Sequence, residues 1–193
     1  MFDALGGEVL PQLDRAASAE DRPVRCWCAG CASGEEVYTL KILWDLKVQA
    51  DTPQTGLEVI GTDADEAVLR RADRGCFPLS SLRGVPDHWR ALAFDRRDRC
   101  YRVRAEHRGG ITFALQDIRH ERPAGPFDLI LCRNLVFTYF EPALQQSMLD
   151  RIGSALRDGG YLAISARERL PRDQDVFEQV DGSREIHRKA LKA

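Results

Sequence analysis

The sequence lacks any apolar run that approaches the roughly 20 residues needed to span a membrane. Its first residues also lack the basic segment and apolar stretch that mark a signal peptide. Basic charge is not in excess either, because 28 lysines and arginines face 30 acidic residues, for a formal net charge of -2. These absences argue against membrane insertion and against a nucleic-acid partner. We therefore expect a cytoplasmic protein, by default a monomer.

The sequence is also short of paired metal ligands. Three of the six cysteines, Cys26, Cys28 and Cys31, lie within six residues, but the other three stand singly. A structural zinc site usually takes four ligands, often as two close pairs. The four histidines show no ligand-like spacing. A metal or redox centre is therefore less favoured than cysteines that pack in the core, and we expect no metal and six reduced thiols in a cytoplasmic protein.

What is present is the pattern of one globular domain, with 44% hydrophobic and 30% charged residues in a chain of 193. Strand and helix signals alternate along it, and the strands are nearly continuous apolar runs. The expected strands are 24–29, 57–63, 111–118, 127–134 and 161–166, and the expected helices are 35–47, 64–75 and 141–160. This alternation predicts an α/β fold with a doubly wound, mostly parallel sheet, whose ligands bind beyond the carboxyl ends of the strands.

The remaining segments divide the chain. An N-terminal amphipathic helix and its connection occupy residues 1–20, and Pro11 can split that helix. The α/β domain follows over residues 21–193, with a small inserted β-hairpin at about 99–115. The segment before this hairpin is expected to form short helical turns. An antiparallel hairpin around Asp181–Gly182 is expected to close the sheet.

The loop after the first predicted strand, "AGCASGEE", is the strongest candidate for a ligand site. Ala29, Gly30 and Gly34 are small enough for a ligand to approach the backbone. Glu35 and Glu36 open the next helix, where they would repel a phosphate and favour a cationic group. The alternative is that both acids merely complement the helix dipole.

A second acid, Asp63, ends the next predicted strand. A carboxylate at this place can accept hydrogen bonds from both hydroxyls of a ribose. Alternatively, Asp63 is only the N-cap of the following helix. A ribose and a cationic group without a phosphate describe S-adenosylmethionine better than NAD or ATP, so we favour S-adenosylmethionine as the cofactor.

Four segments together resemble the CheR-type methyltransferases: "CWCAGCASGEEVYTL", "GTDADEAVLRRADRGCFPLSSL", "FDLILCRNLVFTYFEP" and "LRDGGYLAIS". Enzymes of this family transfer a methyl group from S-adenosylmethionine to glutamate side chains of chemotaxis receptors. The resemblance implies a Rossmann-like methyltransferase fold without the family's N-terminal helical domain. It also implies a protein substrate, such as the cytoplasmic domain of a chemoreceptor, and S-adenosylhomocysteine as the product.

The resemblance further implies which residues bind the cofactor. The loop from Ala29 to Glu36 would hold the methionine end, with Glu36 near its amino group. Asp63 would bind the ribose, and Asp117 and Ile118 would bracket the adenine. Cys132 would line the cofactor site together with the arginine that follows it.

Arg133 and Tyr139 are the catalytic candidates that the resemblance implies, both near the transferred methyl group. An acceptor glutamate is already ionised at neutral pH, so it needs no general base but only alignment with the methyl donor. The planar fork of Arg133 can hold a carboxylate in a fixed orientation. "RNLVFTYF" has one residue more than the family's spacing, which places Thr138 beside the tyrosine. The plainer interpretations are a surface arginine and a core aromatic residue.

Two further hypotheses remain open at this point. The first keeps the cofactor but replaces the protein acceptor with a small-molecule carboxylate or hydroxyl. The second is a noncatalytic cofactor-binding module of a signalling complex.

Overall fold

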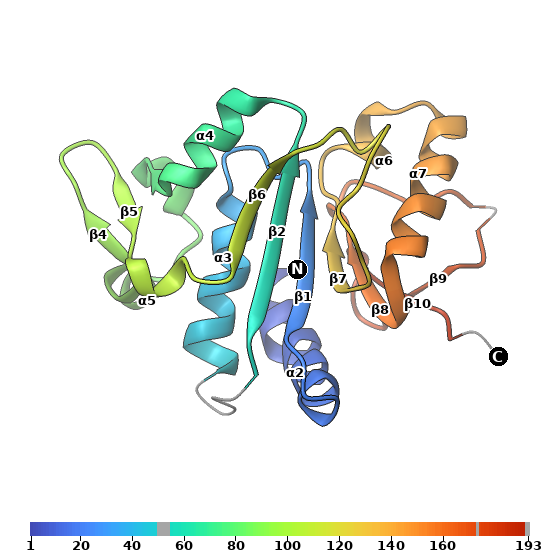
Figure 1. Ribbon diagram of the computed structural model, residues 1–193, viewed down its shortest axis with the longest axis horizontal. Helices are drawn as coiled ribbons and strands as arrows, with labels where there is room; N and C mark the ends of the chain where they lie inside the picture. The colour runs from blue at the N-terminus through green and yellow to red at the C-terminus, as the bar shows by residue number, and fades with distance from the viewer. Residues whose placement is uncertain (50–54, 173, 192–193) are drawn as a thin grey trace.

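The computed structural model describes residues 1–49, 55–172 and 174–191, which form an α/β fold around a seven-stranded sheet (Figure 1). The strand order is β6-β2-β1-β7-β8-β10-β9. The first five strands run parallel, and β10 is antiparallel to both β8 and β9. The strands are β1 (Val24–Ala29), β2 (Leu57–Asp63), β6 (Ile111–Leu115), β7 (Phe127–Leu131), β8 (Leu156–Ala163), β9 (Phe177–Gln179) and β10 (Ile186–Lys189). The predicted doubly wound sheet and its closing hairpin are confirmed.

The central strand β1 shows how the sequence sets the two faces of the sheet. Cys26 and Cys28 join the core cluster on one face, whereas Trp27 and Ala29 join the cluster on the other. Because successive side chains of a strand alternate between faces, this division follows directly from "CWCA". Cys26 and Cys28 are therefore core residues.

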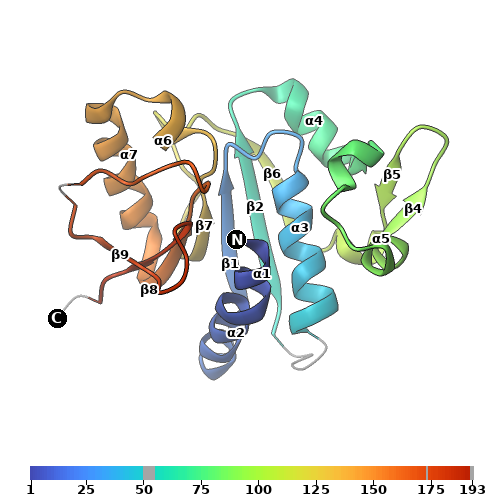
Figure 2. The same cartoon turned by 180° about the vertical axis from the view of Figure 1, so that it is seen from behind.

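Helices cover both faces. The N-terminal helix, α3 and α4 pack on one face, which Figure 2 shows from the front, and α7 packs on the other (Figure 1). The helical elements are α1 (Phe2–Ala4), the π-helical turn η1 (Leu5–Val9), α2 (Leu10–Ala19), α3 (Glu35–Leu43), the π-helical turn η2 (Trp44–Val48), α4 (Glu66–Arg74), α6 (Val136–Tyr139) and α7 (Pro142–Ala155). No helix within the described ranges is both long and apolar enough to cross a membrane.

Pro11 does not split the N-terminal helix. The π-helical turn η1 comes just before it, and the N–H of Leu10 donates to the carbonyl of Leu5. The wider turn accommodates the proline ring, which would clash with the preceding turn of a regular α-helix. The helix therefore continues through α2 and packs on the sheet.

The insertion between α4 and β6 differs from the prediction. It contains β3 (Cys76–Phe77), the 3-10 turn η3 (Leu79–Leu82), α5 (Asp87–Ala93), β4 (Phe94–Arg96), β5 (Tyr101–Val103) and the 3-10 turn η4 (Ala105–His107). These strands form a separate sheet of order β3-β5-β4, with its own small core against Tyr38 and Ile42 of α3. The inserted hairpin is thus β4–β5.

The predicted pairing within residues 99–115 is wrong, because Ile111–Leu115 pairs with β2 in the main sheet. Gly110 makes this possible. It has a φ of 77°, and a Cβ there would lie 2.3 Å from the carbonyl oxygen of Leu57. Only glycine allows the chain to turn this close to β2, away from β5.

The long helix α7 also ends earlier than predicted. It stops at Ala155, and Leu156 is extended and pairs with Phe127. The glycine pair Gly159–Gly160 therefore lies inside β8 and does not end the helix. A Cβ on Gly160 would lie 3.0 Å from the carbonyl oxygen of Asp128, so the glycine permits close approach of β8 to β7.

The expectation of six reduced thiols is wrong for two of them. Cys76 and Cys100, 24 positions apart, form a disulfide with a Cα–Cα distance of 5.7 Å. Pairing of β3 with β5 brings them together, which their isolated positions in the sequence did not indicate. The free, buried cysteines are Cys26, Cys28, Cys31 and Cys132. Burial raises the pKa of all four thiols, to about 12 for Cys31 and Cys132, which keeps them protonated and unreactive.

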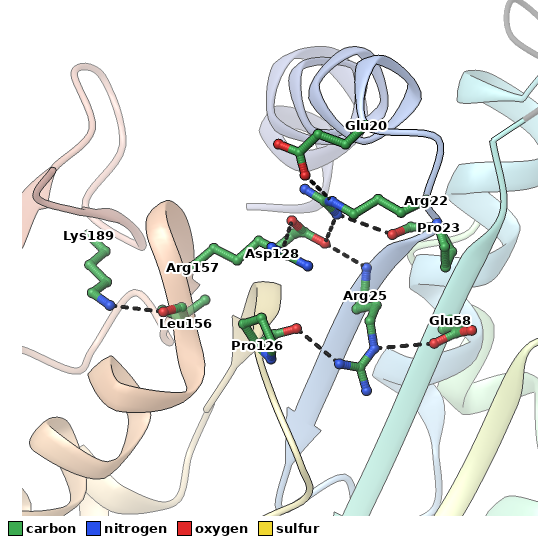
Figure 3. A network of polar contacts seen from close by, with 10 residues as sticks. All are labelled: Glu20, Arg22, Pro23, Arg25, Glu58, Pro126, Asp128, Leu156, Arg157 and Lys189. Atoms are coloured by element: carbon green, nitrogen blue, oxygen red, sulfur yellow. Dashed lines mark hydrogen bonds and ion pairs between the residues drawn. The ribbon is translucent and has the colours of Figure 1, made fainter.

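A buried carboxylate, Asp128, organises the end of the sheet where β1 and β7 begin (Figure 3). Its side chain is 3% exposed and accepts hydrogen bonds from Nη1 of Arg22 at 2.9 Å and from the backbone N–H of Arg25 at 2.8 Å. It also forms an ion pair of 3.3 Å with Nε of Arg157. This network ties the connection after α2 to β1, β7 and β8, at the edge opposite to the site described next.

Candidate functional site

Two hollows are present, a small cleft at the edge of the sheet where the parallel strands end and a large cavity that runs along α3. The small cleft, of about 150 Å³, is lined by Gly30, Thr62, Asp63, Ala64, Gln116, Asp117, Ile118, Arg119, Leu135 and Phe140. The large cavity, of about 610 Å³, lies between α3 and the insertion, with Phe2 and Arg133 also on its wall. The predicted cofactor residues Gly30, Asp63, Asp117 and Ile118 thus meet in one cleft.

The loop after β1 turns sharply into α3 beside this cleft. The N–H groups of Gly30 and Cys31 both donate to the carbonyl of Thr62, and Gly30 has a φ of 71°. A Cβ on Gly30 would lie 2.6 Å from Cδ2 of Leu135. Gly34, with a φ of 86°, is the N-cap of α3. Both glycines are therefore required by backbone shape, as a loop that contacts a ligand needs.

Asp63 holds this loop in place. Its Oδ2 accepts from the N–H of Ala32 at 2.9 Å, and its Oδ1 accepts from the N–H of Asp65 at 3.0 Å. The N-cap of α4 is Asp65, whose side chain accepts from Ala67, so the alternative that Asp63 is that N-cap is wrong. Each oxygen of Asp63 retains a further lone pair that can accept from a ligand hydroxyl.

Asp117 lies at the far side of the cleft and is paired with Arg119. The Nη2 of Arg119 lies 2.5 Å from Oδ2 of Asp117, and its Nε lies 2.9 Å from both oxygens. Hydrogen bonding by this side chain lowers the pKa of Asp117 to about 2, so the carboxylate is ionised. Ile118 is buried and supplies an apolar wall. The sequence analysis did not name Arg119, although the opposite charge two positions after Asp117 is a usable signal.

Glu36 and Arg133 form an ion pair on the wall of the large cavity. Nη1 of Arg133 donates to Oε1 of Glu36, and the two side chains are 20% and 25% exposed. The guanidinium also lies over the ring of Phe2, with 5.6 Å from Cζ to the ring centroid. Burial raises the pKa of Glu36, opposed by the charge of Arg133. The residue expected at the methionine end is thus in contact with the residue expected at the acceptor.

The other predicted site residues are placed differently. Tyr139 ends α6 with a side chain that is 75% exposed, and it lines neither hollow. The structure does not bring it to Arg133, so its catalytic role stays a prediction. Cys132 and Ala29 are buried in the core beneath the loops. Glu35 lines the large cavity, 3.5 Å from Oγ of Ser81.

The walls of the large cavity are mainly apolar and were missed by the sequence analysis. They include Tyr38 and Ile42 of α3 and Phe77, Trp89 and Phe94 of the insertion. The residues of the insertion come from an irregular part of the chain, and the helical spacing of Tyr38 and Ile42 indicated only core packing. The volume falls in the range of about 300–1,000 Å³ that is usual for small-molecule sites.

A buried carboxylate behind the two hollows was missed as well. Glu168 is 3% exposed and accepts from the N–H of Asn134 at 3.1 Å, from the N–H of Ser165 at 2.8 Å and from Oγ1 of Thr138 at 2.6 Å. It stands in the charged run "ARERL", which gave no sign of burial. Within residues 1–49, 55–172 and 174–191, no three His, Cys, Asp or Glu side chains are grouped so as to hold a metal ion.

Residues 1–186 match the family described as "CheR methyltransferase, SAM binding domain". The chain belongs to this family. The predicted resemblance and Rossmann-like methyltransferase fold are thereby confirmed, and so is the predicted cofactor at the level of the family.

Individual relatives are about 30% identical to this CheR-family domain over the aligned residues. It is 32% identical over 185 residues to an "Uncharacterized 104.1 kDa protein in hypE 3'region" of Rhodobacter capsulatus, a match that covers 96% of this chain and 19% of that protein. It is 30% identical over 169 residues to a chemotaxis protein methyltransferase of Listeria innocua, covering 88% of this chain and 62% of the relative. The domain thus spans less than two thirds of these relatives.

Among solved structures, the N-methyltransferase NodS from Bradyrhizobium japonicum WM9, crystallised with S-adenosylhomocysteine, is similar at 18% identity and a TM-score of 0.43. This match covers 79% of this chain and 57% of that one. The strand order of the sheet is the stronger basis for the fold.

The residues present fit S-adenosylmethionine. Asp63 has acceptor lone pairs for a ribose, Ile118 supplies an apolar surface for adenine, and Gly30 leaves the backbone open to a close ligand. Glu35 and Glu36 give the other end of the site an acidic character, which suits the positive charges of a sulfonium and an ammonium group.

Proposed function

We propose that this chain is an S-adenosylmethionine-dependent O-methyltransferase that acts in the cytoplasm on a glutamate carboxylate of a protein, as in chemoreceptor methylation. The family match and relatives such as the chemotaxis protein methyltransferase of Listeria innocua support the reaction and the acceptor. The observation that carries the proposal is the Glu36–Arg133 pair, which joins a residue that would contact the cofactor to one that would contact the acceptor.

The cofactor would lie across the end of β1. Asp63 would accept from the ribose hydroxyls, Asp117 and Ile118 would flank the adenine, and Glu36 would face the ammonium group. When bound, S-adenosylmethionine supplies an electrophilic methyl group on a positively charged sulfur.

The chain itself would orient the acceptor. Arg133 would hold one carboxylate oxygen of the glutamate with its planar fork, so that the other oxygen would form a bond to the methyl carbon as the methyl–sulfur bond breaks and S-adenosylhomocysteine leaves. No proton has to move, since the acceptor is already ionised. Catalysis then rests on alignment and on the apolar walls of the large cavity, which keep water from the reacting oxygen.

Calorimetric titration with S-adenosylhomocysteine, beside an Asp63→Ala control, tests the cofactor half of the proposal. Micromolar binding by the wild type that is lost in the control is the expected result. The acceptor half is tested with tritiated S-adenosylmethionine and a purified chemoreceptor cytoplasmic fragment. Label that is released by mild base as methanol identifies a carboxyl ester. Absence of binding by the folded chain would overturn the proposal.

A second acceptor class is favoured by one observation, the volume of the large cavity. At about 610 Å³ it is as large as a site for a whole small molecule. A methyl ester formed on a small carboxylic acid, with none formed on the receptor fragment, would favour this alternative. Binding of S-adenosylhomocysteine without transfer to either class would favour a noncatalytic module.

A further inference from the structure

Three separate segments meet at the carboxylate of Glu168. Its Oε2 accepts from two backbone N–H groups, that of Asn134 in the loop after β7 and that of Ser165 after β8. Its Oε1 accepts from the hydroxyl of Thr138 in α6 at 2.6 Å. Glu168 lines neither hollow. It therefore lies behind the site and holds together the segments that border it.

Burial of this carboxylate removes it from water, which costs free energy that van der Waals packing alone would not offset. The side chain is 3% exposed, and a buried charge is tolerated only when it is paired or well hydrogen-bonded. Bonds from N–H and O–H groups to a carboxylate are among the stronger hydrogen bonds in proteins. All three bonds are made to the backbone or side chains of two loops and one short helix, so they fix local conformation.

The loop after β7 needs such a restraint. Asn134 is in the left-handed region with a φ of 52°, and Leu135 has φ -134° and ψ -89°, outside the regular regions. Backbone in these conformations persists only where the surroundings enforce it. Glu168 bonds to Asn134, which precedes Leu135, and to Thr138, which follows it, so the backbone is restrained on both sides of Leu135.

This same loop borders both hollows. Arg133 lines the large cavity and pairs with Glu36, and Leu135 lines the small cleft and packs over Gly30. A shift of the backbone at Asn134 would therefore move the guanidinium and the wall of the cofactor cleft together.

We infer that Glu168 is a positioning residue, whose hydrogen bonds to Asn134, Thr138 and Ser165 hold Arg133 in the orientation that methyl transfer requires. The inference rests on the proposed function for its catalytic consequence. Its structural part, the restraint of residues 133–138, stands without that function.

The test compares three variants of the full chain. Glu168→Ala removes all three bonds. Glu168→Gln keeps them, because its amide oxygen can accept both N–H groups and its NH2 can donate to the rotatable hydroxyl of Thr138. Asp128→Asn is the matched control, since Asp128 is equally buried and hydrogen-bonded but lies at the opposite edge of the sheet.

We expect Glu168→Ala to lower kcat for methyl transfer by about 100-fold per folded molecule, the size of effect that a displacement of about 1 Å can cause. Glu168→Gln should recover most of this loss, and Asp128→Asn should lower stability without a selective fall in kcat. Backbone amide exchange of residues 133–138 should be faster in Glu168→Ala than in the wild type and the other two variants.

The outcomes separate the two proposals. Exchange at residues 133–138 that is unchanged in Glu168→Ala overturns the positioning role, whether or not the chain is active. Equal kcat losses in Glu168→Ala and Asp128→Asn, after correction for the folded fraction, also overturn it. If the wild type neither binds S-adenosylhomocysteine nor transfers a methyl group, the proposed function fails, and the exchange comparison still decides the role of Glu168.

Discussion

Arg133 and Glu36 are 97 positions apart in sequence, yet the guanidinium of one donates to the carboxylate of the other. Arg133 follows β7, and Glu36 lies in the first turn of α3 after β1. Because β1 and β7 are neighbouring parallel strands, both residues emerge at the same edge of the sheet. The pair therefore couples the loop that would hold the methionine end of the cofactor to the residue that would hold the acceptor.

Disruption of this pair should show coupling in stability. In a double-mutant cycle of Glu36→Gln and Arg133→Gln, we expect an interaction energy of about 1–2 kcal/mol, since each single change leaves a partly buried group without its partner. Urea unfolding of the four proteins measures it. Strict additivity would show that the pair contributes nothing to the folded state.

Arg133→Lys, which keeps the charge but loses the fork, should still impair methyl transfer.

Cofactor binding should depend on the ionisation of Glu36. Burial raises the pKa of this carboxyl from the ordinary value of 4.5, so acidification protonates it earlier than an exposed glutamate. Affinity for S-adenosylhomocysteine should therefore fall as the pH is lowered from about 8 towards 5, and Glu36→Gln should flatten that dependence. Calorimetry across this range is the measurement. An equal pH dependence in both proteins would assign the effect to another group.

The raised pKa of Glu36 should affect folding stability in the opposite direction from cofactor affinity, because its contribution to folding is largest at low pH. The folded state binds the proton of Glu36 more tightly than the unfolded state does, so this group favours folding below 4.5 and loses that contribution as the pH rises through its raised pKa. The stability difference between the two proteins should thus shift in favour of Glu36→Gln as the pH rises through this window. Urea unfolding at several pH values tests the sign.

Asp63 and Asp65 provide a matched pair of carboxylates. Asp63→Asn should lower the affinity for S-adenosylhomocysteine by about 10- to 100-fold, because charged hydrogen bonds to the ligand and the loop are lost. Asp65→Ala should cost about 1 kcal/mol of stability as a lost helix N-cap, with little change in affinity. If both variants lose affinity equally, the loop geometry and not Asp63 itself determines binding.

The Cys76–Cys100 disulfide should stabilise the insertion. We expect reduction, or the double change Cys76→Ala and Cys100→Ala, to lower the free energy of unfolding by about 3 kcal/mol. Urea unfolding with and without dithiothreitol measures this, and the double variant should not respond to the reductant. An identical unfolding midpoint in reduced and oxidised protein would contradict the prediction.

The effect of this disulfide should be confined to the acceptor side. Phe77, which follows Cys76 in β3, and Phe94 of β4 line the large cavity and not the small cleft. The KM for the acceptor should rise on reduction, whereas the affinity for S-adenosylhomocysteine should stay the same. A parallel loss of both would show that the insertion also supports the cofactor cleft.

The sheet could be predicted because each of its strands carries its own signal. "VRCWCA" and "FDLIL" are nearly continuous apolar runs, and Gly75 ends α4 in the left-handed conformation, as its place after the helix indicated. The small cleft could be predicted for the same reason, since Gly30, Asp63 and Asp117 lie at or just after the ends of strands of the parallel sheet.

The errors occurred where local sequence is compatible with two partners. Tyr101–Val103 could pair with the strand before or after it, and the close approach permitted by Gly110 directs the following strand to β2. The glycine pair Gly159–Gly160 is compatible both with the end of a helix and with a strand that approaches its neighbour closely. In the structure, β8 pairs with β7 and the glycines lie within β8. Glu168 could not be found, because its bonds to Asn134 and Thr138 join segments that only the fold brings together.

The insertion leaves the α/β domain after Gly75 and returns at Ile111, and its core packs against Tyr38 and Ile42 of α3 and against the inner side chains of β6. No strand of the parallel sheet has to be cut to exchange it, and none of its residues lines the small cleft. If the proposed roles hold, the insertion could be exchanged in evolution to change the acceptor, without any change to the residues of the small cleft.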